Sequence, residues 1–198
     1  MRKQKRSAAR NACLLAGIGL LVAAAAVLIV WQWGIRAAEQ QAAASVQTLQ
    51  SILPEPQGAV LEERRDNTMP VLPLDGTDFV GILEMPRYGS VLPVCADWGR
   101  PSRHPCRLEG SIYDGTMQIG GTSQKGQYDF YREISVGDAL FFTDMTGNRY
   151  AYTVTDLRYE KHADQAALAR SDADLTLFVK NIYALEYILV FCDAASAR

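Results

Sequence analysis

The chain has 198 residues, of which 48% are hydrophobic, enough for one ordinary domain with appendages. Its net charge of −2 hides an asymmetry, because five basic residues and no acidic residue stand in the first ten positions. The remainder is acidic, so the composition argues against nucleic acid as a partner.

The N-terminal segment predicts a membrane anchor. Residues 12–31 carry no charge, and about 20 apolar residues are what a helix needs to cross a bilayer core. The basic tail, residues 1–11, predicts a cytoplasmic N-terminus, while Trp31 and Trp33 suit the membrane interface. We therefore predict one transmembrane signal-anchor helix over residues 12–35, with the C-terminal domain extracytoplasmic. A cleaved signal peptide is the alternative, but residues 35–39 are a poor cleavage site.

Residues 36–77 read as a juxtamembrane helix followed by a linker. The segment from Arg36 to Leu53 is rich in alanine and glutamine, which favour a helix. Pro54 and Pro56 end that helix, because proline cannot continue the hydrogen-bond ladder. The chain then stays polar as far as Gly76, as linkers do. The remaining residues, 78–198, form the predicted extracytoplasmic domain.

The C-terminal domain has a β pattern. Short runs rich in β-branched and aromatic residues are separated by glycine, proline, aspartate and asparagine. We predict eight strands, at 79–84, 90–95, 110–113, 116–121, 139–144, 149–157, 175–180 and 187–192, with a hairpin loop at 144–148. Short helices are predicted at 127–134 and 164–169. The predicted fold is therefore mostly β, an eight-stranded closed or nearly closed barrel with one or two short helices.

The last two strands carry a resemblance to a known family. The strand Leu175-Thr-Leu-Phe-Val-Lys180, followed by Tyr187–Cys192, resembles the catalytic strand pair of sortases, the membrane-anchored cysteine transpeptidases of Gram-positive bacteria. There the first strand reads Leu-Thr-Leu-Phe-Thr-Cys. Residues 118–123 are similar to the family's Val-Ile-Ala-Gly-His-Asn, and residues 136–152 to its Gly-Asp strand pair. The resemblance is closest to class B and clostridial-type sortases, and it implies an eight-stranded barrel.

The resemblance also implies that the catalytic groups are lost. A sortase needs a cysteine nucleophile, a histidine that exchanges protons and an arginine that stabilises the oxyanion. The aligned positions hold Lys180, Thr122 and Tyr187. We predict a catalytically inactive homologue in the surface-protein anchoring system, whose partner is a sorting-signal-like peptide, a pilin or an active sortase. We expect no cofactor, and no familiar zinc spacing is present.

The cysteines leave an enzymatic alternative open. Cys95, Cys106 and Cys192 lie in the exported part, so at most one disulfide forms there. Residues 105–107 resemble a Pro-Cys-Arg segment found in some sortases. That resemblance implies a structural Cys106–Cys192 disulfide, with Cys95 as a buried thiol. The alternative is a divergent cysteine transpeptidase that uses Cys192 or Cys95 with His104 or His162. Lys180 itself either binds an anion or is a solvated residue at a strand end.

Overall fold

The computed structural model describes residues 2–53, 57–58, 67–98, 103–161, 172–184 and 186–195. For residues 2–16, 34–39, 41–42 and 57–58 it describes the backbone alone. The chain divides into two compact units, Met1–Glu39 and Gln40–Arg198. The predicted domain limits at residues 36 and 78 remain predictions.

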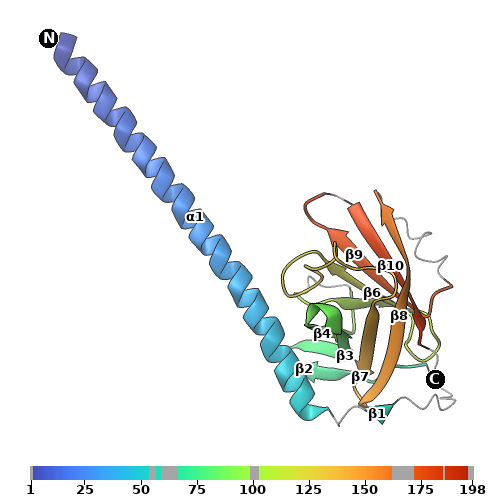
Figure 1. The fold of residues 1–198 in the computed structure, drawn as a ribbon. Coiled ribbons are helices and arrows are strands. Elements are labelled where there is room, and N and C mark those ends of the chain that lie inside the picture. The colour runs from blue at the N-terminus through green and yellow to red at the C-terminus, as the bar shows by residue number, and fades with distance from the viewer. Residues whose placement is uncertain are drawn as a thin grey trace. The chain divides into compact units, whose positions relative to one another are not determined.

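One helix, α1 (Arg2–Ile52), accounts for most of the N-terminal region (Figure 1). Its last turn closes with the backbone N–H of Leu53 donating to the carbonyl of Leu49 at 2.9 Å, just before the predicted stop at Pro54. Over the residues that the structure describes, no helix is long and apolar enough to cross a membrane. The anchor predicted over residues 12–35 is therefore unconfirmed.

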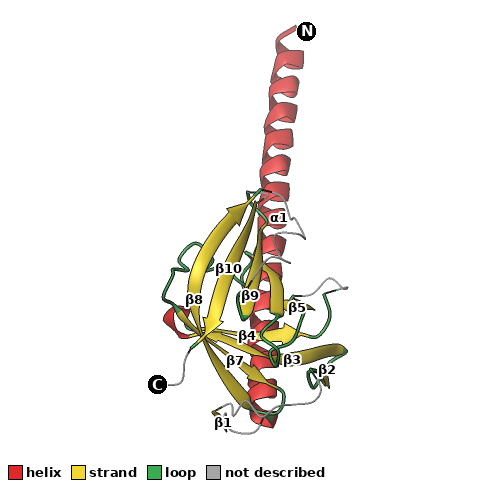
Figure 2. Ribbon diagram, turned by 90° about the vertical axis from the view of Figure 1, so that its right-hand side faces the viewer, coloured by secondary structure: helices red, strands yellow, loops and turns green. Residues whose placement is uncertain are grey.

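Eight strands of the C-terminal unit close into a ring (Figures 1 and 2). Around the ring, β3 pairs with β4, β4 with β5, β5 with β6, β6 with β9, β9 with β10, β10 with β8, β8 with β7, and β7 with β3. The strands are β3 (Thr77–Met85), β4 (Ser90–Cys95), β5 (Cys106–Glu109), β6 (Met117–Thr122), β7 (Ala139–Asp144), β8 (Asn148–Glu160), β9 (Leu175–Asn181) and β10 (Glu186–Ala194). The pairs β4–β5 and β6–β9 are parallel and the others antiparallel. The predicted eight-stranded barrel is confirmed.

Two short strands are added to this ring. β1 (Gln57–Gly58) pairs with the start of β8, and β2 (Leu72–Leu74) pairs with β3. Asp75 and Gly76 join β2 to β3, and both have positive φ, as a two-residue hairpin turn of the Asp-Gly type requires. One short helix, the 3-10 turn η1 (Pro86–Tyr88), lies between β3 and β4.

Alternating side chains build layers on both sides of the barrel wall. In β9, Leu175, Leu177 and Val179 belong to the interior core, as period-two alternation dictates. Phe178 packs on the outer face with Leu189 and Phe191 of β10. Only Lys180 of β9 is exposed.

A further apolar cluster joins the end of α1 to the barrel domain. Leu49 of α1 is fully buried against Phe79 and Ile82 of β3 and against Cys95 and Cys106. We call these five residues the Phe79 cluster. It closes one outer side of the wall and makes the last turns of α1 part of the domain.

Two predicted elements are wrong. Residues 110–113 are a turn rather than a strand, and the strand in this region is β5, which ends at Glu109. Residues 127–134 form successive turns, in which the N–H of Tyr131 bonds Tyr128 and the N–H of Glu133 bonds Phe130, three residues back. Such bonds close single turns and do not extend into an α-helix. The helix predicted at 164–169 lies outside the described residues.

Candidate functional site

The three positions that the sequence predicts as degenerate catalytic positions lie in one row across three neighbouring strands. Thr122 of β6 is the register partner of Lys180 of β9. Lys180 is in turn the register partner of Tyr187 of β10, and Tyr187 is opposite Glu160 of β8. Register partners project to the same face of a sheet. The structure therefore brings Thr122, Lys180 and Tyr187 together on the outer face of the neighbouring strands β6, β9 and β10 (Figure 1).

Lys180 is held by its backbone while its side chain reaches solvent. The backbone N–H of Ser123 donates to the carbonyl of Lys180 at 3.0 Å, which continues the β6–β9 pairing by one step. The neighbouring Asn181 is fully buried, and its side-chain amide donates to Glu186 at 3.0 Å across the hairpin between β9 and β10. The exposed ammonium therefore sits on a fixed backbone, and it can bind an anion without rearrangement of the strand.

Thr122 and Tyr187 are both engaged by neighbours. The N–H and the hydroxyl of Thr122 donate to Oε1 of Gln127 at 2.7 and 3.2 Å. The ring of Tyr187 stacks on Phe178, with ring centroids 5.1 Å apart. The row therefore offers an ammonium, a hydroxyl that is already bonded and an aromatic surface. It has no thiol and no imidazole, the two groups that covalent acyl transfer needs.

Two site neighbours went unpredicted. Gln127 is buried and holds Thr122, but its position in the sequence indicated only a helix. Trp98 lies over Gly120 of β6, where a Cβ atom would stand 2.5 Å from Cζ3 of the indole. A glycine in a strand is a usable signal for such a close approach, although it does not name the residue that approaches.

The structure does not form the predicted Cys106–Cys192 disulfide. Cys192 belongs to the interior core together with Val190, whereas Cys106 belongs to the Phe79 cluster outside the wall. The two sulfur atoms therefore lie in different layers of the domain, and a disulfide needs Cα atoms within about 7 Å and converging Cβ directions.

The candidate nucleophiles of the enzymatic alternative are buried. Cys192 is 0% exposed, and burial raises the pKa of its thiol, with a smaller contribution from Asp193. Thiolates are the reactive form, so this environment is that of an inert core cysteine. Cys95 is 3% exposed in the Phe79 cluster. Neither cysteine lies in the row of Thr122, Lys180 and Tyr187.

His104 is likewise placed away from the row. It packs edge-on against Phe79, with ring centroids 5.5 Å apart, and it is buried. Burial lowers its pKa, and the positive charge of Arg103 lowers it further. The imidazole is therefore a neutral packing group at physiological pH. His162 lies outside the described residues.

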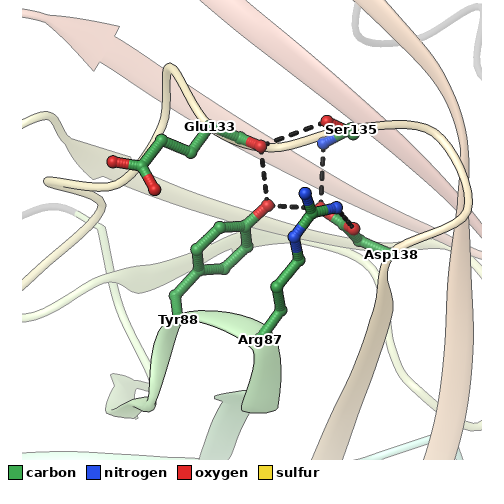
Figure 3. Close-up of polar contacts among 5 residues, drawn as sticks. All are labelled: Arg87, Tyr88, Glu133, Ser135 and Asp138. Carbon is green, nitrogen blue, oxygen red and sulfur yellow. Dashed lines mark hydrogen bonds and ion pairs between the residues drawn. The ribbon is translucent and has the colours of Figure 1, made fainter.

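A second polar cluster ties η1 to the loop before β7 (Figure 3). The carboxylate of Asp138 accepts hydrogen bonds from Arg87, from the hydroxyl of Tyr88 and from the backbone N–H of Ser135 at 2.9 Å. The Tyr88 hydroxyl is also 2.7 Å from the carbonyl of Glu133. Each of the five residues drawn there makes at least one hydrogen bond or ion pair with another, Glu133 through its backbone carbonyl, so we interpret this cluster as structural.

Comparison with solved structures identifies the fold. The chain resembles sortase A from Corynebacterium diphtheriae (17% identity, 61% of this chain and 72% of that chain, TM-score 0.52). It also resembles sortase C1 of Streptococcus agalactiae (18% identity, 61% and 71%, TM-score 0.53) and sortase C1 of Streptococcus suis (16% identity, 61% and 74%, TM-score 0.50).

At such identities the similarity is one of fold, and the chain has the sortase fold. No protein-family model matches the chain, and no curated protein matches it in sequence. The assignment to class B stays a prediction.

Proposed function

We propose that this chain is a sortase-fold protein that binds a peptide or protein partner and lacks transpeptidase activity. The observation that carries the proposal is the row of Thr122, Lys180 and Tyr187 across β6, β9 and β10. If the resemblance in sequence is correct, these are the positions of the histidine, the cysteine and the arginine. All three have changed while the strands that position them have stayed.

The chemistry of the replacements supports inactivity. A lysine that attacked a threonyl carbonyl would form an amide, and an amide does not release the acyl group as a thioester does. Threonine cannot exchange protons near neutral pH, so no general base stands in its place. Tyrosine offers one neutral donor in place of the charged fork of arginine. The nucleophile, the general base and the charged oxyanion donor of the transfer reaction are therefore all replaced.

The same surface supports binding. An exposed ammonium at Lys180 stands beside the stacked rings of Phe178 and Tyr187. This pairing of a cation with an aromatic surface suits an extended peptide that carries a carboxylate. A sorting-signal-like peptide is the proposed ligand, and a pilin or an active sortase that presents such a segment is the proposed partner. The proposed setting is the surface-protein anchoring system of a Gram-positive bacterium.

Restoring the three groups tests this proposal. The full chain is expected to bind members of a sorting-peptide library without cleaving them. The triple variant Thr122→His, Lys180→Cys, Tyr187→Arg is expected to cleave some of them in a thiol-dependent manner, measured by mass spectrometry of the products. The matched control carries Thr122→His, Lys180→Ala and Tyr187→Arg, and it should not cleave because it lacks the thiol.

Two results would contradict the proposal. Cleavage by the unaltered chain that disappears in the Cys192→Ala variant would show a relocated nucleophile. Failure of the unaltered chain to bind any member of the library would show that this outer face is not a peptide site. Circular dichroism of each variant establishes that the barrel is intact.

We further propose that the chain is a single-pass protein of the cell membrane, with its N-terminus in the cytoplasm. The support is the sequence: five basic residues precede 20 uncharged ones at 12–31. The full chain should stay with membranes through an alkaline carbonate wash, and a variant without residues 12–35 should be released. Complete release of the full chain by the wash would refute the anchor.

A further inference from the structure

Two cysteines of the barrel domain stand opposite each other on neighbouring strands. Cys95 is the last residue of β4, Cys106 is the first residue of β5, and the two are register partners. The backbone N–H of Cys95 donates to the carbonyl of Pro105 at 2.8 Å, which fixes the approach of the two strands at this point. Neighbouring strands run about 4.8 Å apart, within the range of Cα separations that disulfides span.

Both side chains point into the same apolar cluster. Cys95 is 3% exposed and Cys106 is 1% exposed, and both pack with Phe79 in the Phe79 cluster. Phe79 is itself the register partner of Cys95 on the other side, in β3. Cys106 lies 3.4 Å from the carbonyl of His104, to which its S–H donates a weak hydrogen bond. The two thiols therefore share one face and one enclosed environment.

We propose that Cys95 and Cys106 are a disulfide site, in place of the Cys106–Cys192 pair that the sequence suggested. The bond forms by thiol–disulfide exchange with a disulfide of another molecule, such as oxidised glutathione or a protein disulfide. One cysteine thiolate first forms a mixed disulfide and releases one thiol. The second cysteine thiolate then displaces the other thiol, so two protein thiols are oxidised and the external disulfide is reduced.

The bond would link the two ends of the segment 96–105, whose Trp98 lies near the candidate site. This loop carries Trp98, which covers Gly120 of β6, two residues before Thr122. It also carries His104, which packs on Phe79. A covalent link at both ends of the loop would therefore fix the side chain that covers the wall next to the row of Thr122, Lys180 and Tyr187. The proposed disulfide is independent of what that row binds.

The test maps the thiols of the full chain made in bacterial cells with an oxidising cytoplasm. Lysis into N-ethylmaleimide traps the thiols, and trypsin then separates the two cysteines at Arg103. The expected product is a crosslinked pair of peptides that contain Cys95 and Cys106, lighter by two hydrogen atoms than the reduced pair. Cys192 should take up maleimide only when the reagent is added in denaturant, because it lies in the interior core.

Thermal unfolding gives an independent reading. The oxidised chain should melt roughly 5 to 10 °C above the chain reduced with a phosphine, because a short closed loop restricts the unfolded state. The Cys192→Ala variant is the matched control and should keep both the crosslink and this redox-dependent shift. The Cys95→Ala and Cys106→Ala variants should lose the shift. Recovery of Cys95 and Cys106 as separate alkylated thiols, or a crosslink from either one to Cys192, would overturn the proposal.

Discussion

Replacing Gly110 by alanine is expected to lower the free energy of unfolding by about 3 to 5 kcal/mol, the sum of backbone strain and a steric clash. Gly110 has φ +75°, a conformation that L-residues with a Cβ rarely adopt. A Cβ atom there would lie 2.0 Å from the carbonyl oxygen of Thr116. Because the obstacle is backbone in a hydrogen-bonded turn, it cannot move aside as a flexible side chain would.

Gly76 is the matched control for Gly110. It has φ +76°, but no atom lies within 4 Å of the position its Cβ would take. Gly76→Ala therefore carries only the strain, about 1 to 2 kcal/mol. Urea unfolding of the two variants, followed by tryptophan fluorescence, measures the difference. Equal losses would show that the turn at Gly110 relaxes around the added methyl group, and that the clash is absent in solution.

The same turn explains the strand that was predicted at the wrong place. Residues 110–113 contain isoleucine and tyrosine, which favour strands, but the segment is closed by local hydrogen bonds. The backbone N–H of Thr116 donates to the carboxylate of Asp114 at 3.1 Å, and the backbone N–H of Ser111 donates to the hydroxyl of Thr116 at 3.2 Å. Short polar side chains offer the backbone this alternative to a ladder. Propensity reasoning weighs the apolar residues and misses those bonds.

Most of the barrel follows from alternation and turn residues alone. Seven of the eight predicted strands coincide with β3, β4, β6, β7, β8, β9 or β10, and the loop at 144–148 joins β7 to β8 as predicted. In that loop the fully buried carboxylate of Asp144 accepts from the N–H groups of Thr146 and Asn148, at 2.8 and 3.0 Å. The alternation of the strands and the hydrogen bonds of the turn both depend on residues close together in the sequence. Such a hairpin can therefore be predicted from the sequence.

In the candidate site, too, features set by contiguous sequence were predictable, and features set by contacts between distant strands were not. Thr122, Lys180 and Tyr187 were found because their strand motifs are contiguous in the sequence, and the register then aligned them. The register partner of Cys106 could not be predicted, because which layer a cysteine joins depends on strand order around the barrel. Motif similarity says nothing of this order. Cys95 is its register partner because β4 and β5 are neighbours in the barrel.

Removing the carboxylate of Asp138 is expected to destabilise the barrel by roughly 2 to 4 kcal/mol, because a buried acceptor of several hydrogen bonds disappears. Asp138 is 6% exposed, and it bonds the hydroxyl of Tyr88 and the backbone N–H of Ser135. In Asp138→Ala the N–H of Ser135 loses its acceptor, and η1 loses its tie to the loop before β7 (Figure 3). Denaturant unfolding near neutral pH measures the loss.

The dependence of this loss on pH identifies the carboxylate as its cause. Burial alone would raise the pKa of Asp138, but hydrogen bonds from Tyr88, Ser135 and Arg87 outweigh burial and lower it. A lowered folded-state pKa stabilises the protein above the ordinary aspartate pKa of about 4, and this contribution is lost as the pH falls through the folded-state value. The stability difference between the unaltered chain and Asp138→Ala should therefore be constant from about pH 5 to 8 and shrink in acid.

Tyr88 causes a loss of stability at alkaline pH, the alkaline limb of the pH dependence, whereas Asp138 causes the acid limb. Burial, and then its hydrogen bond to Asp138, raise the pKa of Tyr88 to about 12. Its contribution is complete below the ordinary tyrosine pKa of about 10 and is lost as the pH rises toward the folded-state value. Tyr88→Phe should remove this alkaline limb and also weaken the acid limb, because the Tyr88 hydrogen bond is the largest contribution that lowers the pKa of Asp138.

Arg87 is the matched control within the cluster, because its side chain is 59% exposed and exposed ion pairs add little. Arg87→Ala should therefore keep the alkaline limb and most of the stability, and weaken the acid limb less than Tyr88→Phe does. If Arg87→Ala loses as much stability as Asp138→Ala, the stabilisation by Asp138 comes from the exposed ion pair. It would then not come from the buried hydrogen bonds.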